Sequence, residues 1–302
     1  MKTGRRIAAV SLAAVLAVGA LGLGLSAARA AAVPAKAAVQ SGVTVYQNGK
    51  AAVDASNLAE GFLMVRYTGG KNVRIKTRIA TPNGINYDYD TNNTGAAETY
   101  PLTEGNGKYT VQVMENTSSN RYALAYSCTV DLKLRDAALP YLYSNQFVNF
   151  TADSKTAAKA KELMAGAGSD TLSKVKVVFD YVVDNFTYDY DRAASVQSGY
   201  LPVVDSVLAA KKGICFDYAA VMAAMLRSQN VPCRLVVGYA GTTYHAWINV
   251  YSPEQGWLDQ VIYFDGTTWT LMDPTFTSSG KRSATIMKYV TDPANYTRKY
   301  AY

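Results

Sequence analysis

Residues 213–247, GICFDYAAVMAAMLRSQNVPCRLVVGYAGTTYHAW, decide the fold of the second half of the chain. Apolar residues recur at helical spacing after Cys215, and the run stops before Pro232, which cannot continue a helix. Cys215 is therefore expected at a helix N-terminus, where unpaired backbone N–H groups and the positive end of the dipole favour an anion. Because the thiolate is the nucleophilic form of cysteine, this position favours a reactive thiol.

Two strands are expected after this helix, at residues 234–239 and 244–251. Gly238 in the first strand predicts a bulge, since a strand glycine often marks one. In the second strand, alternation places His245 and Trp247 on the same face. His245 is the single histidine of the 302-residue chain, so it is the one imidazole that could serve as an acid–base group.

A further strand pair is predicted at residues 257–264 and 267–272, around the hairpin signal Asp-Gly at 265–266. The proline after Asp273 ends the last strand and leaves the Asp273 carboxylate free to turn toward a neighbour. The sequence therefore predicts a carboxylate at a strand end near His245.

These placements predict a catalytic triad. His245 would take the proton of Cys215, and Asp273 would accept a hydrogen bond from the other ring nitrogen and so fix the tautomer. The backbone N–H of Cys215, with one further donor, would stabilise the oxyanion of the tetrahedral intermediate. Each residue alone has a structural reading, as a core cysteine, a satisfied histidine or a turn. Their joint placement favours the catalytic reading.

Four segments in this order, GICFDYA, LRSQNVPCR, YHAWINVY and LMDPTF, resemble the transglutaminase-like superfamily of papain-type thiol enzymes. The resemblance covers residues 153–302 and implies a bacterial, exported member of that superfamily. It implies an α+β core, with N-terminal helices packed on an antiparallel sheet. It carries the triad onto Cys215, His245 and Asp273.

The resemblance also suggests supporting residues. The second oxyanion donor would come from the segment before the cysteine, where Tyr188 is the candidate. Asp217, in the first helical turn, is favourable to the dipole and would pair with Arg234 as a structural support. Trp247 would shield the thiolate from water.

The first thirty residues predict export. A basic start is followed by an apolar run, and Ala28-Arg29-Ala30 offers the small residues of a cleavage site, so the mature chain would begin near Ala31. A retained N-terminal anchor is the alternative, because the apolar run is almost long enough to span a bilayer. This segment holds four of the 30 basic residues and none of the 23 acidic ones, so its removal lowers the net charge from +7 to +3.

Short alternating runs separated by turn residues, such as Asn-Gly at 48–49 and Gly-Gly at 69–70, predict an all-β region with no catalytic constellation. Helical periodicity then begins, with Ser154 or Asp153 and later Asp170 as expected caps. The predicted organisation is a signal peptide at 1–30, a flexible lead at 31–41, a small β-sandwich-like accessory domain at 42–135, a linker at 136–152 and a catalytic domain at 153–302.

Cysteine and tyrosine usage allow two further predictions. Three cysteines are an odd number for an exported chain: Cys128 and Cys233 are either bridged, leaving Cys215 free, or both buried as small unbridged residues, which we favour. The chain has 23 tyrosines against 8 phenylalanines, which suggests a broad polar surface on which tyrosine rings pack while their hydroxyls remain in contact with water.

The functional prediction is a secreted thiol acyl-transfer enzyme that acts on peptide or glutamine amides through a cysteine thioester. The thioester would be resolved by water, as in a protease or amidase, or by an amine, as in cross-linking. The expected partner is a protein or peptide substrate. The expected location is outside the cell, and association with the cell wall or envelope is left open. No cofactor or metal is expected, because no acidic loop resembles a calcium site. No nucleic-acid partner is expected, because the basic residues are scattered. No membrane span is expected after signal cleavage. The alternative is a non-catalytic surface or matrix binding protein on the same scaffold.

Overall fold

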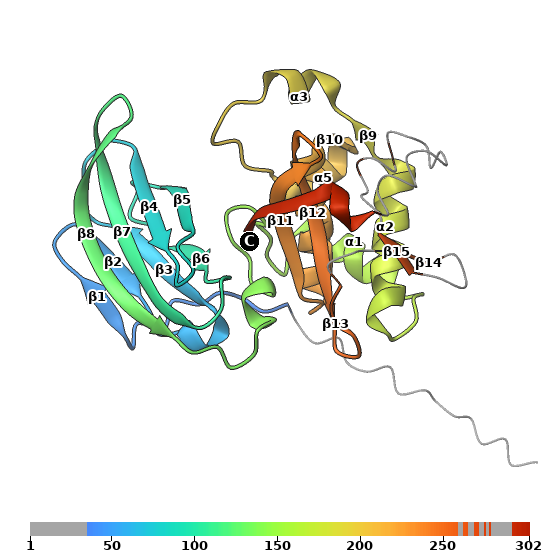
Figure 1. Cartoon of the computed structure of the whole chain (residues 1–302), viewed down its shortest axis with the longest axis horizontal. Helices are drawn as coiled ribbons and strands as arrows, with labels where there is room; N and C mark the ends of the chain where they lie inside the picture. Colours follow the sequence, from blue (N-terminus) through green and yellow to red (C-terminus); the bar gives the residue numbers. More distant parts are fainter. Residues whose placement is uncertain (1–34, 259–261, 265–268, 272–274, 276–277, 279–291) are drawn as a thin grey trace, which may run out of the picture. The chain divides into compact units, whose positions relative to one another are not determined.

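The computed structural model describes residues 35–258, 262–264, 269–271, 275, 278 and 292–302 of the protein. Within these residues an all-β part is followed by a part in which helices pack on an antiparallel sheet (Figure 1). The predicted α+β class is therefore confirmed. The predicted signal segment at 1–30 and Asp273 lie outside the described residues.

Eight strands form the all-β part: β1 (Val45–Gln47), β2 (Ala51–Asp54), β3 (Phe62–Tyr67), β4 (Ile75–Ala80), β5 (Asn86–Thr91), β6 (Glu98–Pro101), β7 (Gly107–Ser118) and β8 (Arg121–Leu132). They make two antiparallel sheets, β1-β2-β3-β6 and β5-β4-β7-β8. The Asn-Gly pair at 48–49 joins β1 to β2 as a hairpin, as predicted. The Gly-Gly pair at 69–70 instead connects strands of different sheets.

Tyrosine packs the core of this part, which corrects the expectation of a broad tyrosine surface. Tyr67, Tyr89, Tyr100 and Tyr109 are each at most 1% exposed. Several of these hydroxyls are hydrogen-bonded within the protein. Tyr67 donates to the Glu115 carboxylate at 2.8 Å, and Tyr109 donates to a backbone carbonyl at 2.8 Å. A buried phenol is tolerated when its hydroxyl is hydrogen-bonded, so the same amphipathic side chain can build a core as well as a surface.

The helices of the second part are α1 (Lys155–Met164), α2 (Thr171–Asn185), α3 (Tyr190–Ser195), α4 (Val204–Ala210) and α5 (Cys215–Ser228). α5 is the central one: every residue from Asp217 to Ser228 is buried. It packs against α1, α2 and α4 and against the sheet, as expected of a helix that is apolar on all sides. The predicted cap of α2 is confirmed, since the Asp170 carboxylate accepts from the Ser173 backbone N–H at 2.9 Å.

The sheet under α5 has the order β13-β12-β11-β16, all antiparallel, and is built from β11 (Cys233–Ala240), β12 (Thr243–Ser252), β13 (Gly256–Leu258) and β16 (Tyr296–Ala301). The predicted strand at 257–264 is divided between β13 and β14 (Ile262–Phe264), and β14 pairs with β15 (Trp269–Leu271). The short parallel pair β9 (Thr187–Tyr188) and β10 (Lys212–Gly213), together with α3 and β16, was not predicted.

The bulge predicted at Gly238 is confirmed. The register of β11 against β16 shifts between Val237 and Gly238. A Cβ at Gly238 would lie 2.0 Å from the backbone oxygen of Thr297. Glycine is therefore required for β16 to approach β11 this closely.

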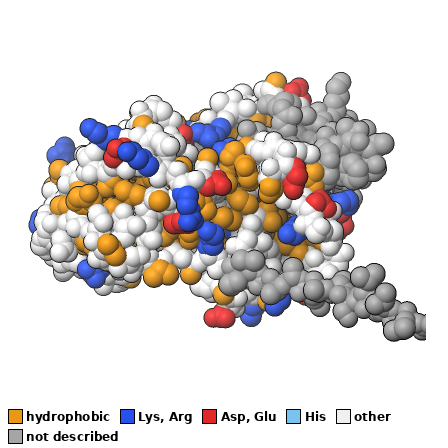
Figure 2. Space-filling model, turned by 90° about the horizontal axis from the view of Figure 1, so that it is seen from below, with side chains coloured by type: hydrophobic (Ala, Val, Ile, Leu, Met, Phe, Trp, Pro, Cys, Tyr) orange, Lys and Arg blue, Asp and Glu red, His pale blue; other side chains and the backbone are white. Residues whose placement is uncertain are grey.

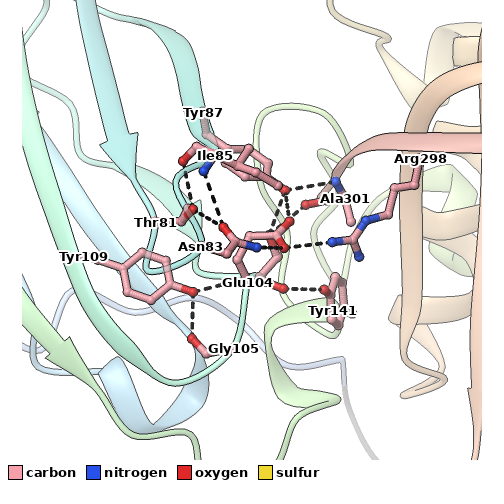
Figure 3. Close-up of polar contacts among 11 residues, drawn as sticks. Thr81, Asn83, Ile85, Tyr87, Glu104, Gly105, Tyr109, Tyr141, Arg298 and Ala301 are labelled. Atoms are coloured by element: carbon pink, nitrogen blue, oxygen red, sulfur yellow. Dashed lines mark hydrogen bonds and ion pairs between the residues drawn. The ribbon is translucent and has the colours of Figure 1, made fainter.

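Polar contacts join β16 to the all-β part (Figure 3). The Arg298 guanidinium pairs with the buried Glu104 carboxylate at 2.7 Å. The backbone N–H of Ala301 donates to the Tyr87 hydroxyl at 3.1 Å, and the Thr103 hydroxyl donates to the Ala301 carbonyl at 2.8 Å. These bonds fix the strand that precedes Tyr302. The predicted division at 42–135, 136–152 and 153–302 stays a prediction.

Candidate active site

The turn before α5 presents Cys215 as the first residue of that helix. Asp217 closes the turn, because its carboxylate accepts from the Ile214 backbone N–H at 2.9 Å. A Cβ at Gly213 would lie 2.5 Å from the Cβ of Asp217, so the turn needs glycine there. The thiol stays partly exposed beside backbone N–H groups that the helix cannot satisfy itself.

β12 carries His245 opposite Gly238 of β11. The imidazole is buried, with 4% of the residue exposed, and it stacks on the Trp247 ring at 6.2 Å between centroids and 19° between planes. Trp247 in turn packs edge-on against Tyr296 at 5.2 Å. The predicted sharing of one strand face by His245 and Trp247 is confirmed, and the indole restricts the orientation of the imidazole.

Cys215 and His245 line the same cavity, whose volume is about 320 Å³. Tyr188, predicted as an oxyanion donor, lies on the wall of this cavity as well. Trp247 is not among the described residues of the wall; it lies behind His245. The structure thus brings two of the three predicted catalytic side chains to one cavity, while Asp273 lies outside the described residues. The catalytic roles stay predictions.

Asp217 contacts a group that the sequence did not predict. Its fully buried carboxylate accepts from the Tyr200 hydroxyl at 2.6 Å and lies 3.5 Å from the Arg192 guanidinium. Burial, together with the bond to Asp217, raises the pKa of Tyr200 to about 12. Tyr200 also lines the cavity, so this network ties the segment before α4 to the first turn of the helix that bears the thiol.

The predicted pair between Asp217 and Arg234 is wrong. Cys233 and Leu235 of β11 belong to the core that includes α5, and alternation along the strand turns Arg234 to the opposite face. There the guanidinium lies over the Trp257 ring, 3.5 Å from its centroid.

We expect Tyr200→Phe to lower the free energy of unfolding by about 1.5 kcal/mol, because the variant loses a partly buried hydrogen bond to a charged acceptor. Chemical denaturation followed by circular dichroism measures the change. Tyr190→Phe is the matched control, since Tyr190 is 68% exposed and should shift stability by less than about 0.5 kcal/mol. Equal stabilities of the two variants would contradict a structural role for the Tyr200 hydroxyl.

Cys128 and Cys233 are both free thiols, which confirms the favoured prediction that they are not bridged. Cys233 is buried as predicted, whereas Cys128 is only half-buried. Burial raises the pKa of Cys128 to about 11 and that of Cys233 to about 12. Both thiols are therefore protonated near neutral pH and are poor nucleophiles there.

Among the described side chains, no group of three or more His, Cys, Asp or Glu residues is arranged to hold a metal ion. None of the helices within the described ranges is long and apolar enough to cross a membrane. On the face that Figure 2 shows, Lys and Arg side chains are spread among polar and apolar ones. The predictions of metal independence and of no nucleic-acid partner stay predictions.

Residues 157–260 match the family profile described as the transglutaminase-like superfamily. This segment, which runs from within α1 to just past β13, is therefore transglutaminase-like, as its motifs predicted. The match includes Cys215 and His245 and ends before Asp273.

Two curated relatives cover part of the chain. YebA of Bacillus subtilis (strain 168), described as uncharacterized, is 24% identical over an alignment of 200 residues, and the match covers 57% of this chain and 27% of YebA. A protein-glutamine gamma-glutamyltransferase of Pseudomonas aeruginosa is 36% identical over an alignment of 70 residues, and the match covers 18% of this chain and 10% of that protein. The chain therefore spans about a quarter or less of the length of these relatives.

Among solved structures, a candidate cysteine protease of Cytophaga hutchinsonii is similar to this chain with a TM-score of 0.39 and 16% identity. The alignment covers 76% of this chain and 72% of that one.

Proposed function

We propose that the protein is an exported thiol acyl-transfer enzyme that acts on peptide or glutamine amides. One observation carries the proposal: Cys215, at the first residue of α5, and His245, on β12, line one cavity. The match of residues 157–260 to the transglutaminase-like superfamily supports the same reaction class, and a relative of this chain is named a protein-glutamine gamma-glutamyltransferase. Export rests on the sequence of residues 1–30 alone.

In the proposed reaction His245 accepts the thiol proton, and the Cys215 sulfur attacks the carbonyl carbon of the amide. The C–N bond of the tetrahedral intermediate breaks, His245 returns the proton to the departing ammonia or amine, and a thioester remains on Cys215. Water or a second amine then attacks the thioester, His245 takes the proton of that nucleophile, and the thiol is regenerated.

The developing oxyanion would be stabilised by the backbone N–H of Cys215, which lies at the positive end of α5. Tyr188 is the proposed second donor, since it lies on the same cavity wall. Asp273 is the proposed partner of the far ring nitrogen of His245. The same side chains would act whether water or an amine attacks the thioester, so these steps do not distinguish hydrolysis from cross-linking. They also do not identify the acyl substrate.

The proposal is tested by incubating the protein with a glutamine-containing peptide library, with and without a primary amine, and with or without a chelator. Mass spectrometry distinguishes cleavage, deamidation and amine incorporation, and Cys215→Ala serves as the blank. We expect products that depend on Cys215 and that form in the presence of the chelator. A library left unchanged relative to the blank would overturn the proposal and favour a binding scaffold.

A further inference from the structure

Aromatic rings form a large part of the wall of the cavity that Cys215 and His245 share. Beyond the histidine, the wall includes six aromatic residues: Phe147, Tyr188, Tyr200, Phe216, Tyr244 and Tyr302. Among the described residues of the wall there is no Lys, Arg, Asp or Glu. A ligand in this cavity would therefore meet ring faces, ring edges and a few hydroxyls.

Two of these rings come from outside the segment 157–260 that matches the superfamily. Phe147 precedes that segment and Tyr302 follows it, yet their ring centroids lie 4.1 Å apart. Phe147 also lies 5.9 Å from Phe216, the residue after Cys215. Parts of this chain beyond the shared core thus shape the space next to the thiol.

The backbone that carries these rings is held firmly. The Tyr302 carbonyl accepts from the Leu235 N–H at 3.0 Å and from the Arg227 guanidinium, and Ala301 is bonded to Tyr87 as described above (Figure 3). The hydroxyl of Tyr200 is bonded to Asp217. The aromatic wall is therefore formed before a ligand arrives, which lowers the conformational entropy lost on binding.

Apolar surface continues outward from the cavity. Tyr244 and Val196 line the cavity and remain 57% and 38% exposed. The Tyr244 ring packs edge-on against Tyr239, which is 40% exposed, at 5.5 Å. Exposed apolar residues gathered beside a concave site are typical of a surface that binds a ligand.

We propose that this cavity binds an uncharged aromatic or large aliphatic side chain that lies next to the amide attacked by Cys215, and that Phe147 determines this specificity. The volume of about 320 Å³ is at the small end for ligand cavities, so it suits one bulky side chain. A Lys or Glu side chain would lose its hydration there without gaining an ionic partner from the described wall. The inference rests on the proposed function for the attack on an amide, but the selectivity of the cavity can be measured without turnover.

The test compares the alkylation of Cys215 in the intact protein by three reagents: N-benzyl iodoacetamide, N-(2-carboxyethyl) iodoacetamide and N-(2-aminoethyl) iodoacetamide. Peptide mass spectrometry gives the rate at Cys215, and each rate is divided by that of the same reagent with glutathione. Burial of the benzyl ring should make the first reagent about 10-fold faster than either charged one. Equal normalised rates, or a faster charged reagent, would overturn the inference.

Phe147→Ala is expected to reduce this preference to about threefold or less, because the ring that faces Tyr302 and Phe216 is lost. Phe150→Ala is the control. Phe150 lies three residues away and is buried, whereas Phe147 is half-buried, but Phe150 lines a different cavity and its loss should leave the preference unchanged. Phe147→Leu retains apolar volume, so it provides a second test if the alanine variant misfolds. It should give an intermediate preference for the benzyl reagent. If both Phe147 variants fold and both keep the full preference for the benzyl reagent, Phe147 does not determine the specificity of the cavity.

The two proposals fail in different ways. If the reaction is wrong, the peptide library shows no product that depends on Cys215, while the benzyl preference in alkylation persists. If the cavity is wrong, the preference is absent, while products that depend on Cys215 still form.

Discussion

Replacing His245 by asparagine is expected to lower kcat/KM for the proposed acyl transfer by about 10³-fold, with the fold retained. A positioned general base contributes about 10² to 10⁴ in rate, and His245 is the single histidine of the chain. Asparagine keeps a polar side chain against Trp247, so the buried position does not become apolar. The measurement is the rate of formation of whichever product the peptide library reveals.

A second readout separates catalysis from structure. The rate of alkylation of Cys215 by iodoacetamide is measured from pH 5 to pH 9, in the wild type and in His245→Asn. We expect the two pH profiles to differ, because the variant lacks the group that is proposed to accept the thiol proton.

The control for both readouts is Tyr251→Phe, on the same strand, which should change either rate by less than about twofold. Identical pH profiles for the wild type and His245→Asn would refute a proton shared between Cys215 and His245.

The helix and strands around the site could be predicted because their signals are local. The apolar period after Cys215, the stop at Pro232 and the alternation through His245 each lie within one element, and the structure contains α5, β11 and β12 with nearly the expected bounds. The predicted bulge at Gly238 also follows from a single residue in a strand.

The aromatic wall could not be predicted, because it depends on contacts between distant parts of the chain. Nothing in the sequence around Phe147 indicates that its ring meets Tyr302, and β16 pairs with β11 across a long separation. Composition alone also could not separate the tyrosines of the core from those of the surface, since a phenol can be buried or exposed according to whether its hydroxyl finds a partner.

The network at Asp217 shows the same limit on a smaller scale. Its position in the first turn of α5 predicted a carboxylate that is favourable to the helix dipole, and the structure places it there, fully buried. Its partners are Tyr200 and Arg192, which a turn and α3 bring back to the helix. The choice of Arg234 failed because a motif fixes the order of residues but not the strand face on which each side chain lies.

Arg227→Met is expected to lower the free energy of unfolding by about 3 kcal/mol. Arg227 is fully buried, and its guanidinium donates to the carbonyls of Cys233 at 2.9 Å, Tyr143 at 2.8 Å and Tyr302. Burial lowers its pKa to about 10, so it stays charged near neutral pH. Each bond from a charged donor contributes about 1.5 to 3 kcal/mol. The variant loses three of them but also recovers several kcal/mol of guanidinium desolvation, which leaves a net loss of this size.

Urea denaturation measures the loss, and Arg78→Met is the matched control. Arg78 pairs with Asp88 on the surface at 2.7 Å, with 41% of its side chain exposed, so its removal should change stability by less than about 1 kcal/mol. Since Arg227 also holds the Tyr302 carbonyl, Arg227→Met should reduce the preference of Cys215 for the benzyl reagent, and Arg78→Met should not. Equal stabilities of Arg227→Met and Arg78→Met would contradict the prediction. The three hydrogen bonds from Arg227 to backbone carbonyls would then not stabilise the contacts of α5 with β11, with the segment at Tyr143 and with the aromatic wall.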